Sequence, residues 1–252
     1  MSMAAGIENL PNEILSEIFV SCLPPDPQPD LLAAPMIFLN ICHRWREIAL
    51  ALPALWMRIR IEFPRAREFE QVLDTWLTRA RLRATSLSLR GSGDKVAPLL
   101  SAVAHHAPHV NTLALCFGKG RRLPDLVGPF SALTTLTISR DQMIPDPPEN
   151  FAHTPSGCIA MMRAAPGLVE CNFRGLYFGE QNPVHPPASS MLTHTSLRRL
   201  NLGCGGRGGN TGALLEYLTL PTLQTLFIVD FDIPVHIFSD FISRSAPPLE
   251  AS

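Results

Sequence analysis

The 252-residue sequence carries little charge, and its charge is balanced. Only 17% of its residues are charged, and 21 basic residues stand against 22 acidic ones, which gives a net charge of −1. A protein that binds the phosphate backbone of nucleic acids needs a cluster or stripe of lysines and arginines. The basic residues here are scattered, so we expect no nucleic-acid partner.

Long apolar runs are also missing. The longest uncharged apolar run, from Leu31 to Cys42, is interrupted by Pro35 and Asn40 and is much shorter than the roughly 20 residues that a membrane-spanning helix needs. The N-terminal residues Met1–Gly6 have neither the basic start nor the apolar stretch of a secretory signal. We expect a chain without a membrane partner, located in the cytoplasm, the nucleus or both.

The cysteines form no CxxC pair and lie within apolar patterns, which argues against a disulfide framework. We expect buried free thiols in a reducing compartment. The six are Cys22, Cys42, Cys116, Cys158, Cys171 and Cys204.

Catalytic motifs are absent as well. The sequence has no GxSxG elbow, no HExxH, no Walker loop and no evident pair of carboxylates in a pocket. We therefore expect no enzyme, no catalytic residue, no cofactor and no metal.

One glycine-rich segment imitates a dinucleotide-binding fingerprint. Gly203-Cys204-Gly205-Gly206-Arg207-Gly208 follows the strand-like run Leu197–Leu202, and Asp230 lies further along the chain where the ribose-binding acid would stand. The segment Gly209–Gly212 separates it from the next helix, and too few residues follow Asp230 for the further strands of a nucleotide domain. A repeat loop is the better interpretation.

Three histidines, His105, His106 and His109, raise the alternative of a metal site. No acid or cysteine lies at ligand spacing from them. Their position at the end of a predicted helix favours capping of its carbonyl groups.

The N-terminal segment predicts two apolar helices. Pro11 suits the first turn of a helix, which then places Ile14, Leu15, Ile18, Phe19 and Cys22 on one side. A second helix is predicted from Pro35 to Pro53, and the apolar residues on its one side are Ile37, Phe38, Ile41, Cys42, Trp45, Ile48, Ala49 and Leu52. So short a segment cannot hide this much apolar surface alone, so it needs something to pack against.

An ordered set of residues in this segment resembles the F-box, and more closely the F-box-like variant abundant in basidiomycete fungi. The set is Leu10-Pro11, Glu13-Ile14-Leu15, Ile18-Phe19, Cys42-x-x-Trp45-Arg46-x-Ile48-Ala49 and Leu55-Trp56, within residues 7–61. The resemblance implies a helical module that docks on the adaptor subunit of an SCF-type cullin–RING ubiquitin ligase. The surplus loop Pro24–Asp30 departs from the family pattern. The alternative is an ordinary helical hairpin at the start of a globular domain.

The resemblance also implies which residues meet the adaptor, although some of them will form the core of the module instead. The candidates are Leu10, Pro11, Ile14, Ile18, Phe19, Cys42 and Trp45.

The rest of the chain repeats one pattern. After a strand-like segment, Met57–Ile61, and a connecting helix within residues 62–83, an apolar-x-x-apolar-x-apolar pattern resembles the leucine-rich repeat. Its copies are Ala84/Leu87/Leu89, Val110/Leu113/Leu115, Leu133/Leu136/Ile138, Leu168/Cys171/Phe173, Leu197/Leu200/Leu202 and Leu223/Leu226/Ile228, and Leu249 opens a seventh. Short helices are predicted between them at 96–106, 157–165, 212–218 and 235–245.

We therefore expect an α/β fold: an N-terminal helical F-box, then an irregular leucine-rich-repeat-like solenoid over residues 84–252. Parallel strands would form one face and short helices the other. Residues 118–130 and the segment Ile144–Glu149 are predicted to be irregular. The Asn or Cys that usually follows each repeat strand is missing, and a generic α/β sheet is the alternative. The strand positions that point away from the core are expected to line the inner face. They are Thr112, Ala114, Cys116, Thr135, Thr137, Ser139, Glu170, Asn172, Arg174, Arg199, Asn201, Thr225, Phe227 and Val229.

The implied function is that of a substrate-recognition subunit of an SCF-type ubiquitin ligase. Its partners would be the adaptor, through it the cullin, and an unknown protein substrate recruited by the repeats. The alternative is a leucine-rich-repeat scaffold without a ubiquitin link, in which the helical segment only caps the repeats. Because Leu249 opens a repeat that Ser252 ends, we also expect a truncated gene model or self-association at the C-terminal end.

Overall fold

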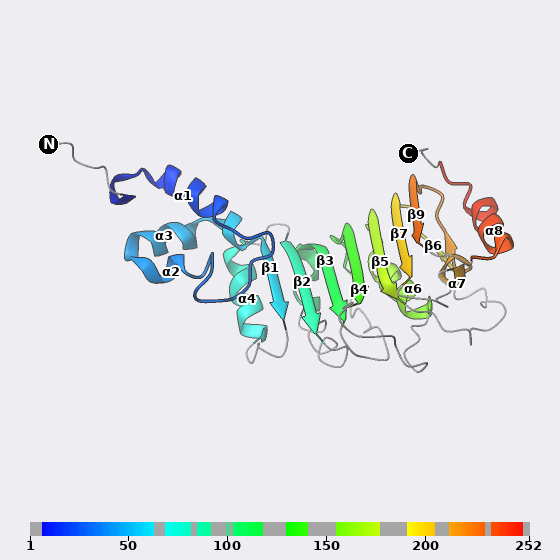
Figure 1. Ribbon diagram of the computed structural model, residues 1–252, viewed down its shortest axis with the longest axis horizontal. Helices are drawn as coiled ribbons and strands as arrows, with labels where there is room; N and C mark the ends of the chain where they lie inside the picture. Colours follow the sequence, from blue (N-terminus) through cyan, green and yellow to red (C-terminus); the bar gives the residue numbers. More distant parts are fainter. Residues whose placement is uncertain are drawn as a thin grey trace. The chain divides into compact units, whose positions relative to one another are not determined.

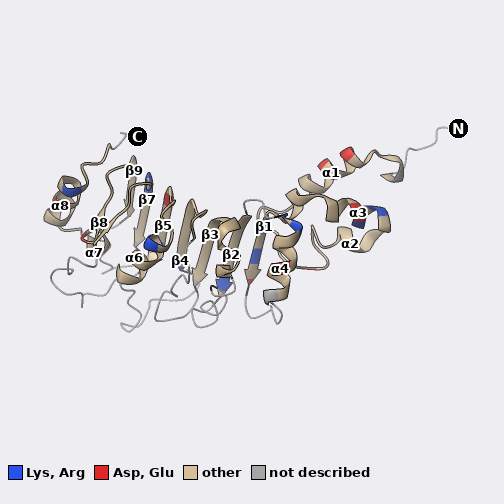
Figure 2. Ribbon diagram, turned by 180° about the vertical axis from the view of Figure 1, so that it is seen from behind, with Lys and Arg blue, Asp and Glu red and all other residues tan. Residues whose placement is uncertain are grey.

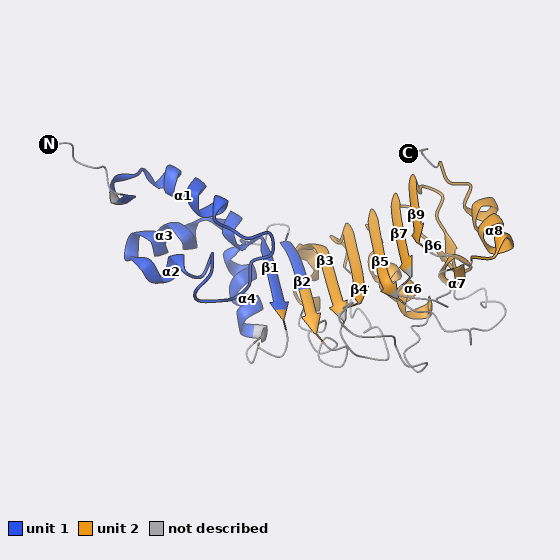
Figure 3. Cartoon of the chain, viewed as in Figure 1, with its two compact units in different colours: residues 1–61, 66–88 blue, residues 62–65, 89–252 orange. Residues whose placement is uncertain are grey.

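The protein is a mixed α/β chain with a mostly parallel seven-stranded sheet. The computed structural model describes residues 7–62, 69–81, 85–91, 100, 103–117, 130–140, 155–176, 191–204, 212–229 and 233–248. The chain divides into two compact units, which Figure 3 colours separately. Unit 1 comprises residues 1–61 and 66–88, and unit 2 comprises residues 62–65 and 89–252.

Unit 1 is largely helical. Its elements are η1 (Ile7–Asn9), α1 (Asn12–Ser21), α2 (Phe38–Ile41), α3 (His43–Ala51), η2 (Pro53–Trp56), β1 (Arg58–Glu62, whose last residue belongs to unit 2), α4 (Phe69–Arg79) and β2 (Thr85–Gly91), which is divided between the units. Helix α1 begins directly after Pro11, whose extended backbone caps its N-terminus. The predicted connecting helix within residues 62–83 is present as α4.

The prediction of one helix from Pro35 to Pro53 is wrong, because the chain breaks at Cys42. The backbone of Cys42 is extended, with φ −157° and ψ 167°, and it separates α2 from α3. The Arg46 side chain donates from Nε to the carbonyl oxygen of Leu39 at 3.0 Å, so one carbonyl at the end of α2 has a partner outside that helix. The apolar periodicity continues across the break, which is why it gave no sign of the break.

Two aromatic clusters form the core of unit 1. In the first, the ring of Phe19 stacks on Phe38 with centroids 4.2 Å apart, and Trp45 packs against Phe19 at 4.9 Å. In the second, Trp56 and Trp76 meet edge to face at 4.9 Å. Both indole N–H groups donate to backbone carbonyls, Trp56 to Ala49 at 2.9 Å and Trp76 to Arg58 at 3.0 Å, so neither polar atom is left unsatisfied.

Unit 2 is an array of strands with short helices between them. Its elements are η3 (Ala107–His109), β3 (Val110–Phe117), β4 (Thr135–Arg140), α6 (Pro155–Ala164), β5 (Glu170–Leu176), β6 (Leu192–Thr193), β7 (Arg199–Cys204), α7 (Gly212–Leu215), β8 (Leu218–Thr219), β9 (Thr225–Val229) and α8 (Val235–Ser245). The sheet order is β1-β2-β3-β4-β5-β7-β9, which is the order of these strands in the sequence (Figure 1). The two strands that it leaves out, β6 and β8, pair with each other. The pairs β3/β4, β4/β5, β5/β7 and β7/β9 are parallel.

Much of the core of unit 2 is formed by the apolar positions of the repeat pattern. Two rows of core residues cross the parallel strands in register: Leu113, Leu136, Cys171, Leu200 and Leu226, then Leu115, Ile138, Phe173, Leu202 and Ile228. All of them are buried except Leu226 and Ile228 on β9, which are partly exposed. The strand prediction is therefore confirmed for these five strands, which lie in one sheet as expected.

The helices between the strands match the sequence less closely. The predicted helix 235–245 is α8, and 157–165 is α6 shifted by two residues at its start and one at its end. The predicted helix 212–218 ends at Leu215, because Leu218–Thr219 forms the short strand β8, which pairs with β6. This two-stranded sheet was not predicted, since two residues are too short for a pattern.

Several sequence predictions lie outside the described residues. These are the irregular segments at 118–129 and 144–149, most of the glycine-rich segment after Cys204, Asp230, Leu249, and much of the predicted helix 96–106, of which the structure describes only 100 and 103–106.

The prediction of buried thiols is correct for some cysteines and wrong for others. Cys158 and Cys171 are free and buried, and burial raises the pKa of both thiols. Cys22 and Cys42 are free but exposed, because one follows the end of α1 and the other lies in the break before α3. Among the described helices, none has the length and hydropathy to cross a bilayer.

Candidate interaction surfaces

The first candidate surface is one side of α1. A helix turns about 100° per residue, so residues three and four apart share a side. Ile14 and Ile18 are spaced in this way, and Leu10 and Pro11 precede the helix at the same spacing. We call these four residues the Ile14 face. Pro11 and Ile14 are exposed, and Leu10 and Ile18 are partly exposed. An apolar side chain such as Ile14, 42% exposed, stays in contact with water although the helix has a buried side available.

The Arg44 side chain brings the start of α1 next to the start of α3. Its guanidinium donates to the Oδ1 of Asn12 from Nε at 3.1 Å and from Nη2 at 2.8 Å, and also to the carbonyl oxygen of Leu10. Cys42 stands two residues before Arg44 and is exposed. The structure therefore links Leu10 and Asn12 to the start of α3, two residues after Cys42.

Two of the candidate adaptor residues belong to the first aromatic cluster instead. Phe19 has no exposed surface, so it serves the core of unit 1. Trp45 packs on Phe19 and keeps part of its ring exposed. The sequence left open how the seven candidates divide between core and surface, and the structure assigns Phe19 to the core.

The second candidate surface is the exposed face of the parallel strands in unit 2. Three rows of side chains cross it in register, and their members alternate with the core residues along each strand. The rows are Thr112, Thr135, Glu170, Arg199 and Thr225; Ala114, Thr137, Asn172, Asn201 and Phe227; and Cys116, Ser139, Arg174, Gly203 and Val229. We call these three rows the strand face.

Hydrogen bonds link the polar residues of the strand face across the strands. Asn172 donates to Thr137 Oγ1 at 3.3 Å and to Glu170 Oε1 at 3.0 Å, and its Oδ1 accepts from Asn201. Arg199 pairs with Glu170, with 2.9 Å between Nη2 and Oε2. The hydrogen bond from Asn172, assisted by Arg199, holds the pKa of the Glu170 carboxyl below its usual range, while partial burial acts against this.

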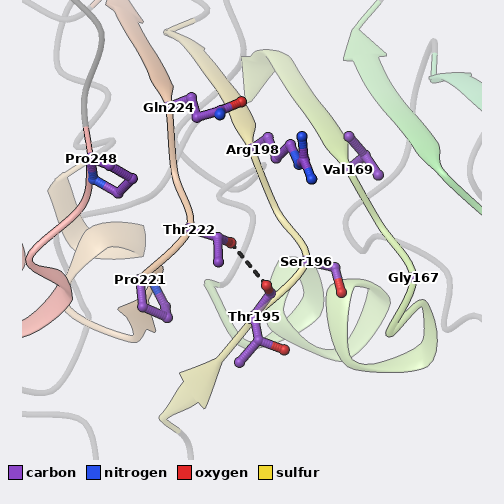
Figure 4. A pocket seen from close by; sticks show the side chains of 9 residues that line it. All are labelled: Gly167, Val169, Thr195, Ser196, Arg198, Pro221, Thr222, Gln224 and Pro248. Carbon is purple, nitrogen blue, oxygen red and sulfur yellow. Dashed lines mark hydrogen bonds between the residues drawn. The ribbon is translucent and has the colours of Figure 1, made fainter.

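A groove adjoins the strand face where the strands begin. Its volume is about 570 Å³, and Figure 4 shows its lining, which consists of Gly167, Val169, Thr195, Ser196, Arg198, Pro221, Thr222, Gln224 and Pro248. Three of these residues stand one position before the first row of the strand face. They are joined by backbone hydrogen bonds, from the Arg198 amide to the Val169 carbonyl at 2.9 Å and from the Gln224 amide to the Arg198 carbonyl at 2.8 Å.

The hydrogen bonds of Asn172 across the strands could be predicted only in part. The sequence placed Asn172 and Asn201 on the side of successive strands that points away from the core, but the leucine-rich-repeat pattern expects its asparagine after each strand. The repetition of asparagine at matching positions, in register between β5 and β7, was the signal for it. The groove was not predicted, because its lining comes from connecting segments without a periodic pattern.

The described residues contain no group of three or more metal-ligating side chains. The metal alternative at His105, His106 and His109 thus finds no support among them. One other histidine, His194, is buried and makes a contact of 3.0 Å from Nε2 to the carbonyl oxygen of Ala165. Burial lowers the pKa of His194, although the contact with Ala165 opposes this.

Charges do not gather into a patch on the described elements. Figure 2 shows acidic residues on α1 and basic ones on α3 and α6, distributed over both units. Comparison with known proteins adds no further constraint: no family model, no curated protein and no solved structure matches this chain.

Proposed function

We propose that the protein is a substrate-recognition subunit of an SCF-type cullin–RING ubiquitin ligase. Unit 1 would be an F-box-like module that docks on the adaptor, and through it on the cullin. Unit 2 would be a degenerate leucine-rich-repeat solenoid that recruits a protein substrate in the cytoplasm or nucleus.

The observation that carries this proposal is the exposure of the Ile14 face. The module already has an aromatic core formed by Phe19, Phe38 and Trp45. Leu10, Ile14 and Ile18 are nevertheless exposed at least in part, and Pro11 and Cys42 are exposed as well. Exposed apolar side chains that gather at one place favour a protein-binding role. These same positions carry the resemblance to the F-box, so two independent arguments point to one surface.

The regular succession of strands supports the second half of the proposal. The second to sixth repeat copies form strands β3, β4, β5, β7 and β9, each paired in parallel with the one before, and α6 and α8 lie between or after strands in the chain order. Stacked units of this kind present a long exposed face for a protein partner.

The test is co-purification of the tagged protein with the adaptor. The chain offers a matched pair of variants on α1, Ile14→Glu and Val20→Glu. The two side chains are almost equally exposed, at 42% and 41%, but they lie about 120° apart around the helix because six residues separate them. We expect Ile14→Glu to abolish adaptor recovery and Val20→Glu to leave it nearly unchanged.

A second variant tests the same surface from its other end. The double variant Leu10→Ala/Pro11→Ala should lose the adaptor while keeping its circular dichroism spectrum. Full adaptor recovery by this folded variant would argue against the proposal. Retention of the adaptor by Ile14→Glu would do the same, and the scaffold alternative would then be preferred.

A further inference from the structure

We propose that the groove beside the strand face binds the carboxylate of an acidic segment in the protein partner, and that an apolar side chain of the same segment packs on Phe227. The inference rests on the proposed function, in which unit 2 recruits a protein substrate. It specifies the chemistry of that substrate.

The groove carries one positive charge on its described lining. Among the described residues that line it, Arg198 is the only ionisable one, and Thr195, Ser196 and Gln224 add hydroxyl and amide groups. Arg198 is exposed, and no described carboxylate lies within ion-pair distance of it. A guanidinium with neighbouring donors matches a carboxylate, which it can bind through two parallel hydrogen bonds.

Arg199, the residue after Arg198, differs from it in having a partner within the protein. Arg199 already pairs with Glu170, which also accepts a hydrogen bond from Asn172. That carboxylate is therefore held within the strand face and does not neutralise Arg198. The two adjacent arginines thus have different roles, because one closes a contact inside the protein and the other remains open to an incoming anion.

An exposed apolar side chain, Phe227, lies near the groove. Gln224 lines the groove, and Phe227 stands three residues further along β9, with 58% of its surface exposed. Three residues of strand span about 10 Å. Val229 lies on the same side and is also exposed, so apolar surface continues along the strand.

The spacing defines a motif. A peptide in the polyproline II conformation repeats every three residues and rises about 3.1 Å per residue, so side chains three positions apart lie on one side, roughly 9 Å from each other. A segment in this conformation lying along β9 with its acidic side chain at Arg198 would therefore place an apolar side chain over Phe227 three positions away. The groove and Phe227 together fit a peptide in which Asp or Glu and an apolar residue are separated by two others.

The experiment is selection of random 12-residue peptides displayed on phage, with the full-length chain as bait. We expect enriched peptides to carry Asp or Glu three positions from Leu, Ile, Met or Phe. For an enriched peptide bearing a fluorescent label, Arg198→Gln should weaken binding about tenfold, the size expected for a hydrogen bond to a charged group. Phe227→Ala should weaken it at least tenfold.

The matched control is Arg163→Gln, the same change at an exposed arginine on α6 outside the groove, which should alter binding less than about twofold. Arg198→Glu should in addition prefer the peptide in which lysine replaces the acid. Enrichment of peptides without an acid, no enrichment above an unrelated bait, or equal losses for Arg198→Gln and Arg163→Gln would overturn the inference. The adaptor is absent from this experiment, so failure here is distinct from failure of adaptor recovery.

Discussion

The two units differ in what they present to water. Unit 1 buries aromatic rings and leaves apolar side chains on its surface, among them Ile14 on α1 and Ile41 on α2. Unit 2 buries most of the apolar rows of its strands and, on β5 and β7, links the polar side chains Glu170, Asn172, Arg199 and Asn201 to one another by hydrogen bonds. The exposed apolar side chains of unit 1 are thus available for contacts, whereas the polar side chains on β5 and β7 already take part in contacts within the protein.

Substitutions on the two surfaces should therefore have different consequences, for binding in unit 1 and for stability in unit 2. In unit 1 the exposed face contributes little to folding, so changes there should affect partners alone. In unit 2 the strand face contains a polar network whose loss costs stability, because buried polar atoms would lose their partners. Four predictions test this contrast, from the largest expected effect to the smallest.

Trp56→Ala should have the largest effect on stability. Trp56 is fully buried, contacts Trp76, and lies under the guanidinium of Arg79 at 4.5 Å from its ring centroid. Removal of such a ring costs about 3–5 kcal/mol. The free energy of unfolding from urea titration measures this loss. Ile14→Ala, on the exposed face, should change it by less than about 0.5 kcal/mol. Equal losses would contradict the separation of core and surface in unit 1.

Asn172→Ala should destabilise unit 2 by about 1–3 kcal/mol. The side chain is 5% exposed and makes hydrogen bonds to Thr137, Glu170 and Asn201, which would lose a partner on truncation. Thr137→Ala removes only the longest of these bonds and should cost less. Urea titration compares the two variants, and a neutral Asn172→Ala would show that the network does not stabilise the strand face.

His194 should make the stability depend on pH below neutrality. Burial lowers the pKa of this histidine in the folded state, so the unfolded chain takes up a proton first as the pH falls below its ordinary value of 6.5. Stability is therefore complete above pH 6.5 and decreases as the pH falls below it. The difference between the urea midpoints at pH 7.5 and 5.5 should be smaller for His194→Gln than for the wild type. An unchanged difference would exclude His194 as a cause.

Glu170 should give the smallest effect, in a lower range of pH. Its folded pKa lies below the ordinary value of 4.5, so its contribution is complete above pH 4.5 and is lost as the pH falls through the folded value. The carboxylate is partly exposed and screened by salt, which keeps the contribution small. Glu170→Gln should flatten the dependence of the urea midpoint between pH 5 and 3. A steeper dependence of the urea midpoint on pH in this variant would contradict a lowered pKa of Glu170 in the folded protein.

The strands were predictable because their pattern alternates with a period of two and recurs along the chain. Val110, Leu113 and Leu115 in one repeat correspond to core positions in the next, and each strand buries the same side. The break at Cys42 was not predictable, because the apolar residues on both sides keep helical spacing. The exposure of individual residues in the candidate surfaces also depends on contacts distant in sequence, such as that of Arg44 with Asn12.

The sequence also could not show which of the candidate adaptor residues are buried and which are exposed. Phe19 and Ile14 are both apolar and five residues apart on one helix, and the sequence gives them equal standing. Only the ring stacked on Phe19, supplied by Phe38 from another segment, shows which of the two is buried.

The break before α3 also makes Cys42 a reporter of docking. Its thiol is free and exposed, two residues before Arg44, which bonds to Leu10 of the Ile14 face, while Cys158 and Cys171 are buried. A maleimide reagent should therefore modify Cys42 in the native protein and leave those two thiols unmodified. Occupation of the face by another protein would slow the reaction at this one position, so mass spectrometry of labelled peptides can follow association residue by residue, without any substitution in the chain.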